Sequence, residues 1–193
     1  MKYAGRPKLG MRSTLTISLL LSVLAAGTSS AQGRPAGRVN LGSDRIGGVR
    51  FGVPKEKAVA SLRALFGAPG AQGINTACGP RYTEVEWGDL VAEFRSNKFS
   101  GYRFLKGGYP LHTVGSPREP RPKTVFPKLA TSEGITLGST LARLRSADKV
   151  LRSVGTDKWQ SGSGLIFVDN AKHDPEPPSS QIVEIKTGTC GDF

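Results

Sequence analysis

Few side chains of this 193-residue sequence have the types and spacing that catalysis requires. Glu84 and Glu86 lie two residues apart in an alternating segment, so both carboxylates would lie on one face of a strand. Two such groups can act as general acid and base, but the polar outer face of a sheet has the same spacing. Asp169, Asn170 and Asp174 offer oxygen ligands without the spacing of a calcium loop. We therefore predict no metal site, and a hydrolase built on these acids is the least favoured alternative.

The other nucleophile and cofactor patterns are also incomplete. His112 and His173 lie in proline-containing segments, far in sequence from any serine or cysteine that could act as a nucleophile. Two cysteines and two histidines do not form a zinc motif. The glycine-rich run 162–164 has neither the following helix nor the lysine of a phosphate-binding loop. We predict no catalytic residue, no cofactor and no enzymatic activity.

Aromatic and arginine side chains are better candidates, and the chemistry they indicate is recognition. Such residues supply much of the binding free energy at protein interfaces. Most of them lie on or beside one predicted sheet, where residues that alternate with the core would face a partner. The alternative is that the aromatic rings form the core, because a small sheet needs them to bury enough area. The candidate binding residues are Tyr82, Trp87, Arg95, Tyr102, Arg103 and Trp159.

The only two cysteines of the sequence are Cys78 and Cys190. In an oxidising compartment such a pair is most simply a disulfide, which here would join the first half of the chain to its last residues. Reactive thiols are the alternative. Neither cysteine lies in a Cys-x-x-Cys motif or close in sequence to a histidine, so we predict the structural disulfide.

The first 31 residues have the features of an export signal. Four basic residues precede an apolar run from Leu15 to Gly27, and the small residues 29–31 form a site for signal peptidase. The run is shorter than the roughly 20 residues that a bilayer-spanning helix needs. We predict cleavage after Ala31, a secreted or periplasmic protein, and no membrane span after cleavage. Met1 and Met11 both remain candidate starts.

The chain is basic, with 27 lysines and arginines against 15 acidic residues and a net charge of +12. The predicted signal contains four of the basic residues, which leaves 23 against 15 and a net charge of +8 after cleavage. This balance favours anionic partners outside the cell, either an exported protein or an anionic envelope polymer. Nucleic acid is not expected, because the chain is exported and its basic residues are scattered. A basic surface with no dedicated partner remains the alternative.

One sequence pattern occurs twice and organises the chain. Residues 48–52 and 134–138 both read Gly-(Val/Ile)-polar-apolar-Gly, and helical spacing of apolar residues follows each of them. Such a repeat indicates one supersecondary unit used twice. We predict a flexible leader over 32–45, a first unit over 46–106, a proline-rich linker over 107–130 and a second unit over 131–193.

Each unit is predicted to contain one helix and one closing hairpin. The first helix would begin at Pro54 and end before Gly67, followed by a glycine-rich loop over 70–80. Ser139 would cap the second helix, whose apolar stripe consists of Leu141, Leu144, Ala147 and Leu151. Hairpins over 90–104 and 164–186 would follow. The predicted fold class is therefore α+β, with two tandem helix-plus-antiparallel-hairpin units that could share one curved sheet.

The repeated glycine motif, the amphipathic helix, the loop and the hairpin of each half resemble the units of beta-lactamase inhibitory proteins. They are also similar in pattern to the small lipoproteins of outer-membrane protein assembly, and similar tandem sequences occur among exported bacterial proteins of unassigned function. The resemblance covers most of residues 46–188. It implies a joint antiparallel sheet that grips a partner protein.

Together these features favour a secreted, non-catalytic binding protein. Its sheet face would recognise an exported protein or an anionic envelope component. The alternative is a basic structural protein of the cell envelope with no single specific partner. Strong salt sensitivity without a saturable partner would be the sign of that second function.

Overall fold

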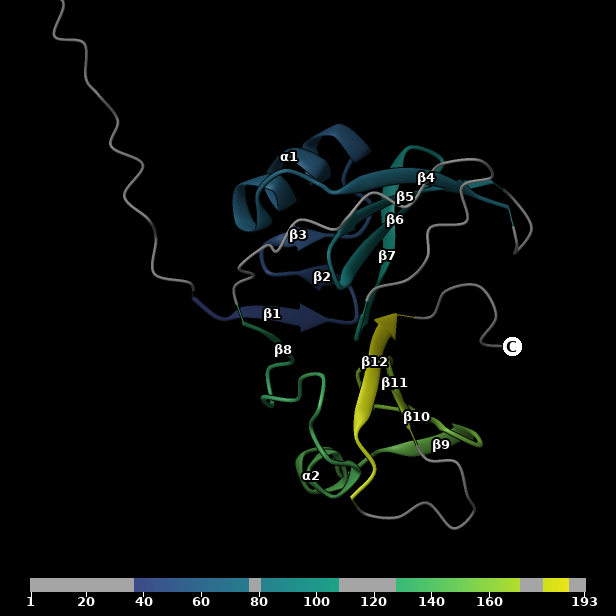
Figure 1. Ribbon diagram of the computed structural model, residues 1–193. Coiled ribbons are helices and arrows are strands. Elements are labelled where there is room, and N and C mark those ends of the chain that lie inside the picture. Colours follow the sequence, from purple (N-terminus) through teal and green to yellow (C-terminus); the bar gives the residue numbers. More distant parts are fainter. Residues whose placement is uncertain (1–36, 77–80, 108–127, 171–178, 188–193) are drawn as a thin grey trace, which may run out of the picture. The chain divides into compact units, whose positions relative to one another are not determined.

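The computed structural model describes residues 37–76, 81–107, 128–170 and 179–187, all within the unit Arg34–Phe193 (Figure 1). The predicted export signal lies outside the described residues. The described residues are mainly β-structure, with 47% in strands and 16% in helices.

The elements follow one another in two stretches of the chain. The first stretch contains β1 (Val39–Gly42), β2 (Arg45–Ile46), β3 (Val49–Arg50), α1 (Lys55–Phe66), β4 (Ala71–Asn75), β5 (Tyr82–Trp87), β6 (Leu90–Arg95) and β7 (Lys98–Leu105). The second stretch contains β8 (Leu129–Ala130), α2 (Leu141–Ala147), β9 (Arg152–Gly155), β10 (Lys158–Gln160), β11 (Leu165–Asp169) and β12 (Ile182–Thr187).

These strands form two sheets. The larger sheet has eight strands in the order β4-β5-β6-β7-β12-β11-β10-β9, and each neighbouring pair is antiparallel. Its two halves meet where β7 pairs with β12, with Phe104 opposite Ile185. The smaller sheet has the order β3-β2-β1-β8, and β1 runs parallel to β8. The second stretch of the chain therefore contributes to both sheets.

The two helices begin and end for different local reasons. Pro54 precedes α1, which buries Ala58, Leu62 and Phe66 at a spacing of four residues and ends at Gly67 with a φ of 83°. The cap of α2 is Thr140, whose hydroxyl accepts a hydrogen bond from the backbone N–H of residue 143 at 3.2 Å.

Two details of the predicted second helix are therefore wrong. Ser139 was expected to cap it, but its hydroxyl instead accepts a hydrogen bond from the N–H of Thr136 at 3.0 Å. The helix ends at Ala147, so Leu151 lies beyond it. Because α2 begins after Thr140 and ends at Ala147, it has only seven residues, about two turns.

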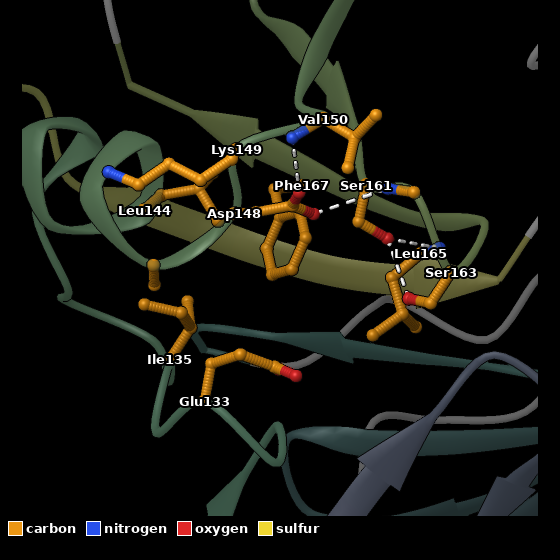
Figure 2. A pocket seen from close by; sticks show the side chains of 12 residues that line it. Glu133, Ile135, Leu144, Asp148, Lys149, Val150, Ser161, Ser163, Leu165 and Phe167 are labelled. Carbon is orange, nitrogen blue, oxygen red and sulfur yellow. Dashed lines mark hydrogen bonds between the residues drawn. The ribbon is translucent and has the colours of Figure 1, made fainter.

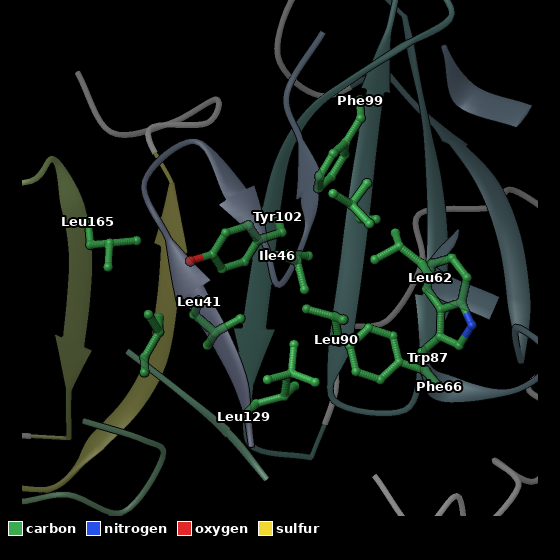
Figure 3. Close-up of a cluster of buried hydrophobic side chains, with 14 of the residues drawn as sticks. Leu41, Ile46, Leu62, Phe66, Trp87, Leu90, Phe99, Tyr102, Leu129 and Leu165 are labelled. Carbon is green, nitrogen blue, oxygen red and sulfur yellow. The ribbon is translucent and has the colours of Figure 1, made fainter. Parts of the chain in front are cut away.

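The main core lies between α1, the smaller sheet and one face of the eight-stranded sheet, which we call the core face (Figure 3). Phe66 and Trp87 have ring centroids 6.4 Å apart, and Leu62 and Leu90 are fully buried beside them. Burial of each such side chain contributes about 1.5–3 kcal/mol to folding. The hydroxyl of Tyr102 donates to the carbonyl oxygen of Gly42 at 3.1 Å and so ties the two sheets together.

The predicted fold class is wrong in its proportions and its units. The chain is mostly β, and a continuous eight-stranded sheet and a four-stranded sheet take the place of two helix-plus-hairpin units. The missed strands are short or polar: β4 occupies the predicted glycine-rich loop, and β9 and β10 contain few apolar residues. Their local propensity for strand is weak, and pairing with neighbours in the sheet overrides it.

The repeated glycine motif has a clear structural role. Gly52 and Gly138, the last residues of the two copies, have φ values of 85° and 80°. The N–H of Gly52 donates to the carbonyl oxygen of Phe99 in β7 at 2.7 Å, and that of Gly138 to Ile182 in β12 at 2.8 Å. Each motif thus ends in a glycine with a left-handed backbone, which is hydrogen-bonded to a central strand of the large sheet. That strand is β7 for the first motif and β12 for the second.

Parts of the predicted domain division differ from the structure. Residues 32–45 were expected to be a flexible leader, yet β1 lies in this range and its Leu41 is a core residue. Its pairing with β2 and β8 explains the order of this segment. Most of the predicted linker lies outside the described residues, as do both partners of the predicted disulfide, Cys78 and Cys190.

Candidate functional site

The eight-stranded sheet has a second face, opposite the core face, which we call the polar face. Strand alternation and the observed register place a set of mainly charged side chains on it. The apolar residues Val91 and Ile166 on this face are buried but are not part of the core cluster. The polar-face residues include Asn75, Tyr82, Glu84, Glu86, Glu93, Arg95, Arg103, Lys158, Glu184 and Lys186.

Arg103 lies between two buried glutamates in the centre of the first half of this face. Glu84 in β5 is directly opposite Glu93 in β6, and both are at most 1% exposed. The Nη2 atom of Arg103 lies 2.5 Å from Oε1 of Glu84, and its Nε atom lies 3.0 Å from Oε1 of Glu93. The side-chain amide of Asn75 in β4 also donates to Oε1 of Glu84, at 2.9 Å. Four neighbouring strands thus hold one buried cation between two carboxylates.

Glu93 is the member of this cluster whose protonation is displaced most clearly. Burial raises the pKa of Glu93 to about 7, because the charged form loses its hydration. Arg103 opposes this rise and Glu84 adds to it. Within the described part of the chain, Oε2 of Glu93 is buried and accepts no hydrogen bond. This carboxyl group is therefore partly protonated near neutral pH.

Tyr82 and Arg95 lie at the margin of the same cluster. The guanidinium carbon of Arg95 is 5.1 Å from the centroid of the Tyr82 ring, a cation–π distance. Burial, with the nearby charges of Glu93 and Glu84, raises the pKa of Tyr82 to about 12, so its phenol stays neutral. Arg95 is only half-buried. The ring therefore holds a partly accessible cation in one position.

The structure divides the six residues that the sequence singled out for binding. Tyr82, Arg95 and Arg103 come together on the polar face. Trp87 and Tyr102 are 1% and 0% exposed and belong to the core, which was the alternative explanation for the aromatic rings. Trp159 lies on the core-face side of β10, where its Nε1 donates to Oδ2 of Asp169 at 3.0 Å.

The two acids with strand spacing have different surroundings. Glu84 is at the centre of the cluster, whereas Glu86 lies opposite Val91 in the next row of the sheet.

Sequence reasoning missed Glu93 and Asn75. A signal for Glu93 is present, because it is the only charged residue within the otherwise apolar run 90–94. An acid in such a run, one strand away from another buried acid, indicates a buried ionic cluster.

A pocket of about 330 Å³ lies in the second half of the chain, between α2 and the turn that joins β10 to β11 (Figure 2). Its floor is apolar and buried, and its rim is polar. The hydroxyl of Ser132 lowers the pKa of Glu133 on this rim by hydrogen bonding. The floor residues are Ile135, Leu144, Leu165 and Phe167, and the rim includes Glu133, Asp148, Lys149, Ser161 and Ser163.

Comparison with known proteins assigns no family to this arrangement: no family model matches the chain, and no curated protein or solved structure matches it significantly. Among the described residues, no group of three or more His, Cys, Asp or Glu side chains is placed to hold a metal ion. In the same part of the chain, no helix has the length and apolarity needed to cross a membrane.

Proposed function

We propose that this is an exported, non-catalytic binding protein that recognises an anionic partner through Arg95, a half-buried cation at the margin of the polar face of its eight-stranded sheet. The observation that carries the proposal is the Arg95–Tyr82 contact beside the Glu84–Arg103–Glu93 cluster. Arg95 is a half-buried cation that is held on a ring, so little of its conformational freedom remains to be lost on binding. A carboxylate of an exported protein or of an envelope polymer is its natural counterpart.

The buried cluster supports a role other than stability. Removing two carboxylates and a guanidinium from water costs several kcal/mol per ion, and the attraction between them seldom exceeds that cost. An apolar centre would stabilise the sheet at least as well. We infer that the cluster fixes the geometry of the polar face, with Arg103 orienting β5, β6 and β7 relative to one another.

The distribution of charge supports an anionic partner. The described residues include four buried acids, Glu84, Glu86, Glu93 and Asp169, but only two buried bases, Arg103 and Lys186. Burial therefore removes more negative than positive side chains from the surface of a chain that is already basic. The exposed surface carries an excess of cations, which would accelerate the encounter with an anionic partner.

The proposal is tested by affinity capture with the oxidised chain 32–193 as bait against the envelope and culture fluid of the producing cell. Bound material is eluted in steps of increasing salt and identified by mass spectrometry. We expect one protein to remain bound at high salt, and Arg95→Gln to weaken its affinity by about fivefold or more. Arg63→Gln is the matched control, since it removes the same charge from an exposed position on α1, which packs on the core face.

Two outcomes would end the proposal. Release of diverse polymeric material at modest salt would instead indicate a basic structural protein of the envelope. Equal losses for Arg95→Gln and Arg63→Gln would show that net charge alone attracts the partner. In either case the polar face would have no specific role.

A further inference from the structure

The edge strand β9 has the features of a docking site for another strand. Among the described strands it pairs only with β10, with an irregular register around Val154, and all four of its residues are exposed. Large exposed apolar side chains in the described part of the chain are Ile74, Val150 and Val154. Two of these lie here: Val154 in β9 is 47% exposed, and Val150, two residues before the strand, is 57% exposed. An unpaired strand edge with exposed apolar residues is a template for strand addition.

The pocket and this edge have one residue in common, Val150. Val150 lines the pocket, and β10 leads from its pairing with β9 directly into the pocket residue Ser161. Figure 2 shows Val150 on one side of the space and Ile135 on the other, with Phe167 between them. A strand edge with an adjacent pocket is the combination by which many domains bind extended peptides: the backbone supplies affinity and the pocket supplies specificity.

Hydrogen bonds hold the mouth of the pocket in place. The carboxylate of Asp148 accepts from the N–H of Val150 at 2.9 Å and from that of Gly162 at 3.2 Å, which joins the end of α2 to the β10–β11 turn. The hydroxyl of Ser161 accepts from the N–H of Leu165 at 2.9 Å. A pre-formed pocket loses little entropy when it is filled.

The charges at this edge indicate the chemistry of the partner. Lys149 and Arg152 are exposed on either side of Val150, and β9 itself contains no acid. Arg152 is opposite Gln160, so it lies on the polar-face side of the sheet, whereas Leu165 and Phe167 of the pocket floor lie on the core-face side. A strand added to β9 would therefore match this edge if apolar and acidic residues alternated along it.

We propose that β9 and the adjacent pocket form a second binding site, which takes an extended segment of a partner protein that adds to β9 as a strand, places an apolar side chain in the pocket and directs acidic side chains toward Arg152. This site does not depend on the Arg95–Tyr82 contact, because Arg152 lies at the β9 edge of the sheet, whereas Tyr82 and Arg95 lie in β5 and β6.

The test uses the chain as secreted and processed by an expression host. The probe is an acetylated and amidated hexapeptide in which glutamate alternates with leucine, and binding is followed by backbone amide chemical shifts and hydrogen exchange. We expect saturable shifts in β9, β10 and the pocket, and slower exchange of the β9 amides. A peptide with three leucines followed by three glutamates, which cannot alternate, is expected to bind about tenfold more weakly.

Two pairs of matched variants locate the site. Val154→Glu should weaken the alternating peptide about tenfold, because it places a like charge on the edge. Ile74→Glu makes the same change in charge at an equally exposed residue of β4, the other edge of the sheet, and should leave affinity within twofold. Ala147→Phe would partly fill the pocket and weaken binding, whereas Ala142→Phe, also exposed on α2 but outside the pocket, should not.

Three results would overturn the inference. Equal binding of the two peptides would show that the site does not recognise alternating side chains. Equal effects of Val154→Glu and Ile74→Glu would show that β9 is not the binding site. A concentration-dependent dimer that Val154→Glu abolishes would make a second copy of this chain the occupant of the edge. None of these results bears on the polar face, since Arg95→Gln should leave peptide binding unchanged while it weakens capture of the anionic partner.

Discussion

The two halves of the eight-stranded sheet are covered unequally on the core face. In the half formed by β4–β7, the twelve-residue helix α1 buries Ala58, Leu62 and Phe66 against the sheet. In the half formed by β9–β12, the seven-residue helix α2 buries only Leu141 and Leu144, and a pocket remains between it and the β10–β11 turn. One shared sheet therefore has a closed half and an open half, and helix length accounts for the difference.

The charged side chains of the polar face are also more deeply buried in the first half than in the second. In β4–β7, Glu84, Glu93 and Arg103 are buried and bound to one another. In the other half, Lys186 is buried, but Lys158 and Glu184 are half-buried. The first half keeps its charges in a fixed internal arrangement, and the second leaves more of them accessible. We infer that the first half orders the sheet while the edge of the second half is the more adaptable surface.

The largest effect is expected from breaking the cluster of the first half. Arg103→Met should lower the free energy of unfolding by about 3–5 kcal/mol at pH 8, because it leaves two carboxylates buried without their cation. Urea unfolding of both chains measures the difference. The exposed Arg63→Met on α1 is the control and should change stability by less than about 0.5 kcal/mol.

The loss of unfolding free energy on Arg103→Met should be smaller when Glu93→Gln is also present, since one of the two buried carboxylate charges is then absent. A double-mutant cycle gives the coupling between Arg103 and Glu93. If Arg103→Met proves as mild as Arg63→Met, the buried cluster does not order the first half and the contrast between the two halves fails.

Truncation of matched leucines tests how tightly each helix closes its half. Leu62→Ala in α1 should cost about 3–4 kcal/mol, because it opens a cavity in a packed core. Leu144→Ala in α2 should cost about 2 kcal/mol, since this side chain already borders the pocket and loses fewer contacts. Both residues are at most 1% exposed, so chemical denaturation compares them directly. Equal losses would contradict a closed and an open half.

The pH dependence of stability should report Glu93. Its pKa is about 7 in the folded chain and near its ordinary value of 4.5 in the unfolded chain. Between these values the folded chain retains a proton that the unfolded chain has lost, so this contribution is complete below about pH 4.5 and is lost as the pH rises through 7. The loss amounts to about 3 kcal/mol.

Glu93→Gln should therefore flatten the profile between pH 4.5 and 7 and be more stable than the parent chain at pH 8. Unfolding by urea at several pH values provides the measurement, with Glu56→Gln, at an exposed position on α1, as the control. An unchanged slope in Glu93→Gln would assign the pH dependence to other groups.

The smallest effects are expected where the two halves are alike. Gly52→Ala and Gly138→Ala each force a side chain into the left-handed region, with no heavy atom within 4 Å of the added Cβ. Each should cost about 1–2 kcal/mol from backbone strain alone. Thermal or chemical unfolding of the two variants should give equal losses. A large difference would show that the two glycine motifs hold their strands in different ways.

Sequence reasoning was most successful where a local signal is strong. The spacing of Ala58, Leu62 and Phe66 predicts α1, and the alternation at 83–87 predicts β5. It failed for β4, β9 and β10, whose exposed, polar or glycine-containing residues carry little local preference for a strand. These strands exist because a neighbouring strand offers them a ladder of hydrogen bonds.

The candidate site was predicted only in part, for the same reason. Tyr82, Arg95 and Arg103 were identified by residue type, but the type could not separate them from Trp87 and Tyr102. Which face a residue occupies depends on the register, and a shift by one residue exchanges the faces. Export and the disulfide between Cys78 and Cys190 remain predictions, since they concern residues outside the described ranges. The resemblance to inhibitory proteins also remains a prediction, since no match to a known protein bears on it.

The sequence by itself determined the basic balance, the first helix and the strands with strong alternation, because each depends on residue composition or on neighbours along the chain. Only the tertiary structure decided that β7 pairs with β12, that Glu84 meets Glu93 around Arg103, and that a short α2 leaves a pocket beside an unpaired edge. These features join residues that are distant in sequence, and their energies arise from burial and pairing that exist only after the strands have come together.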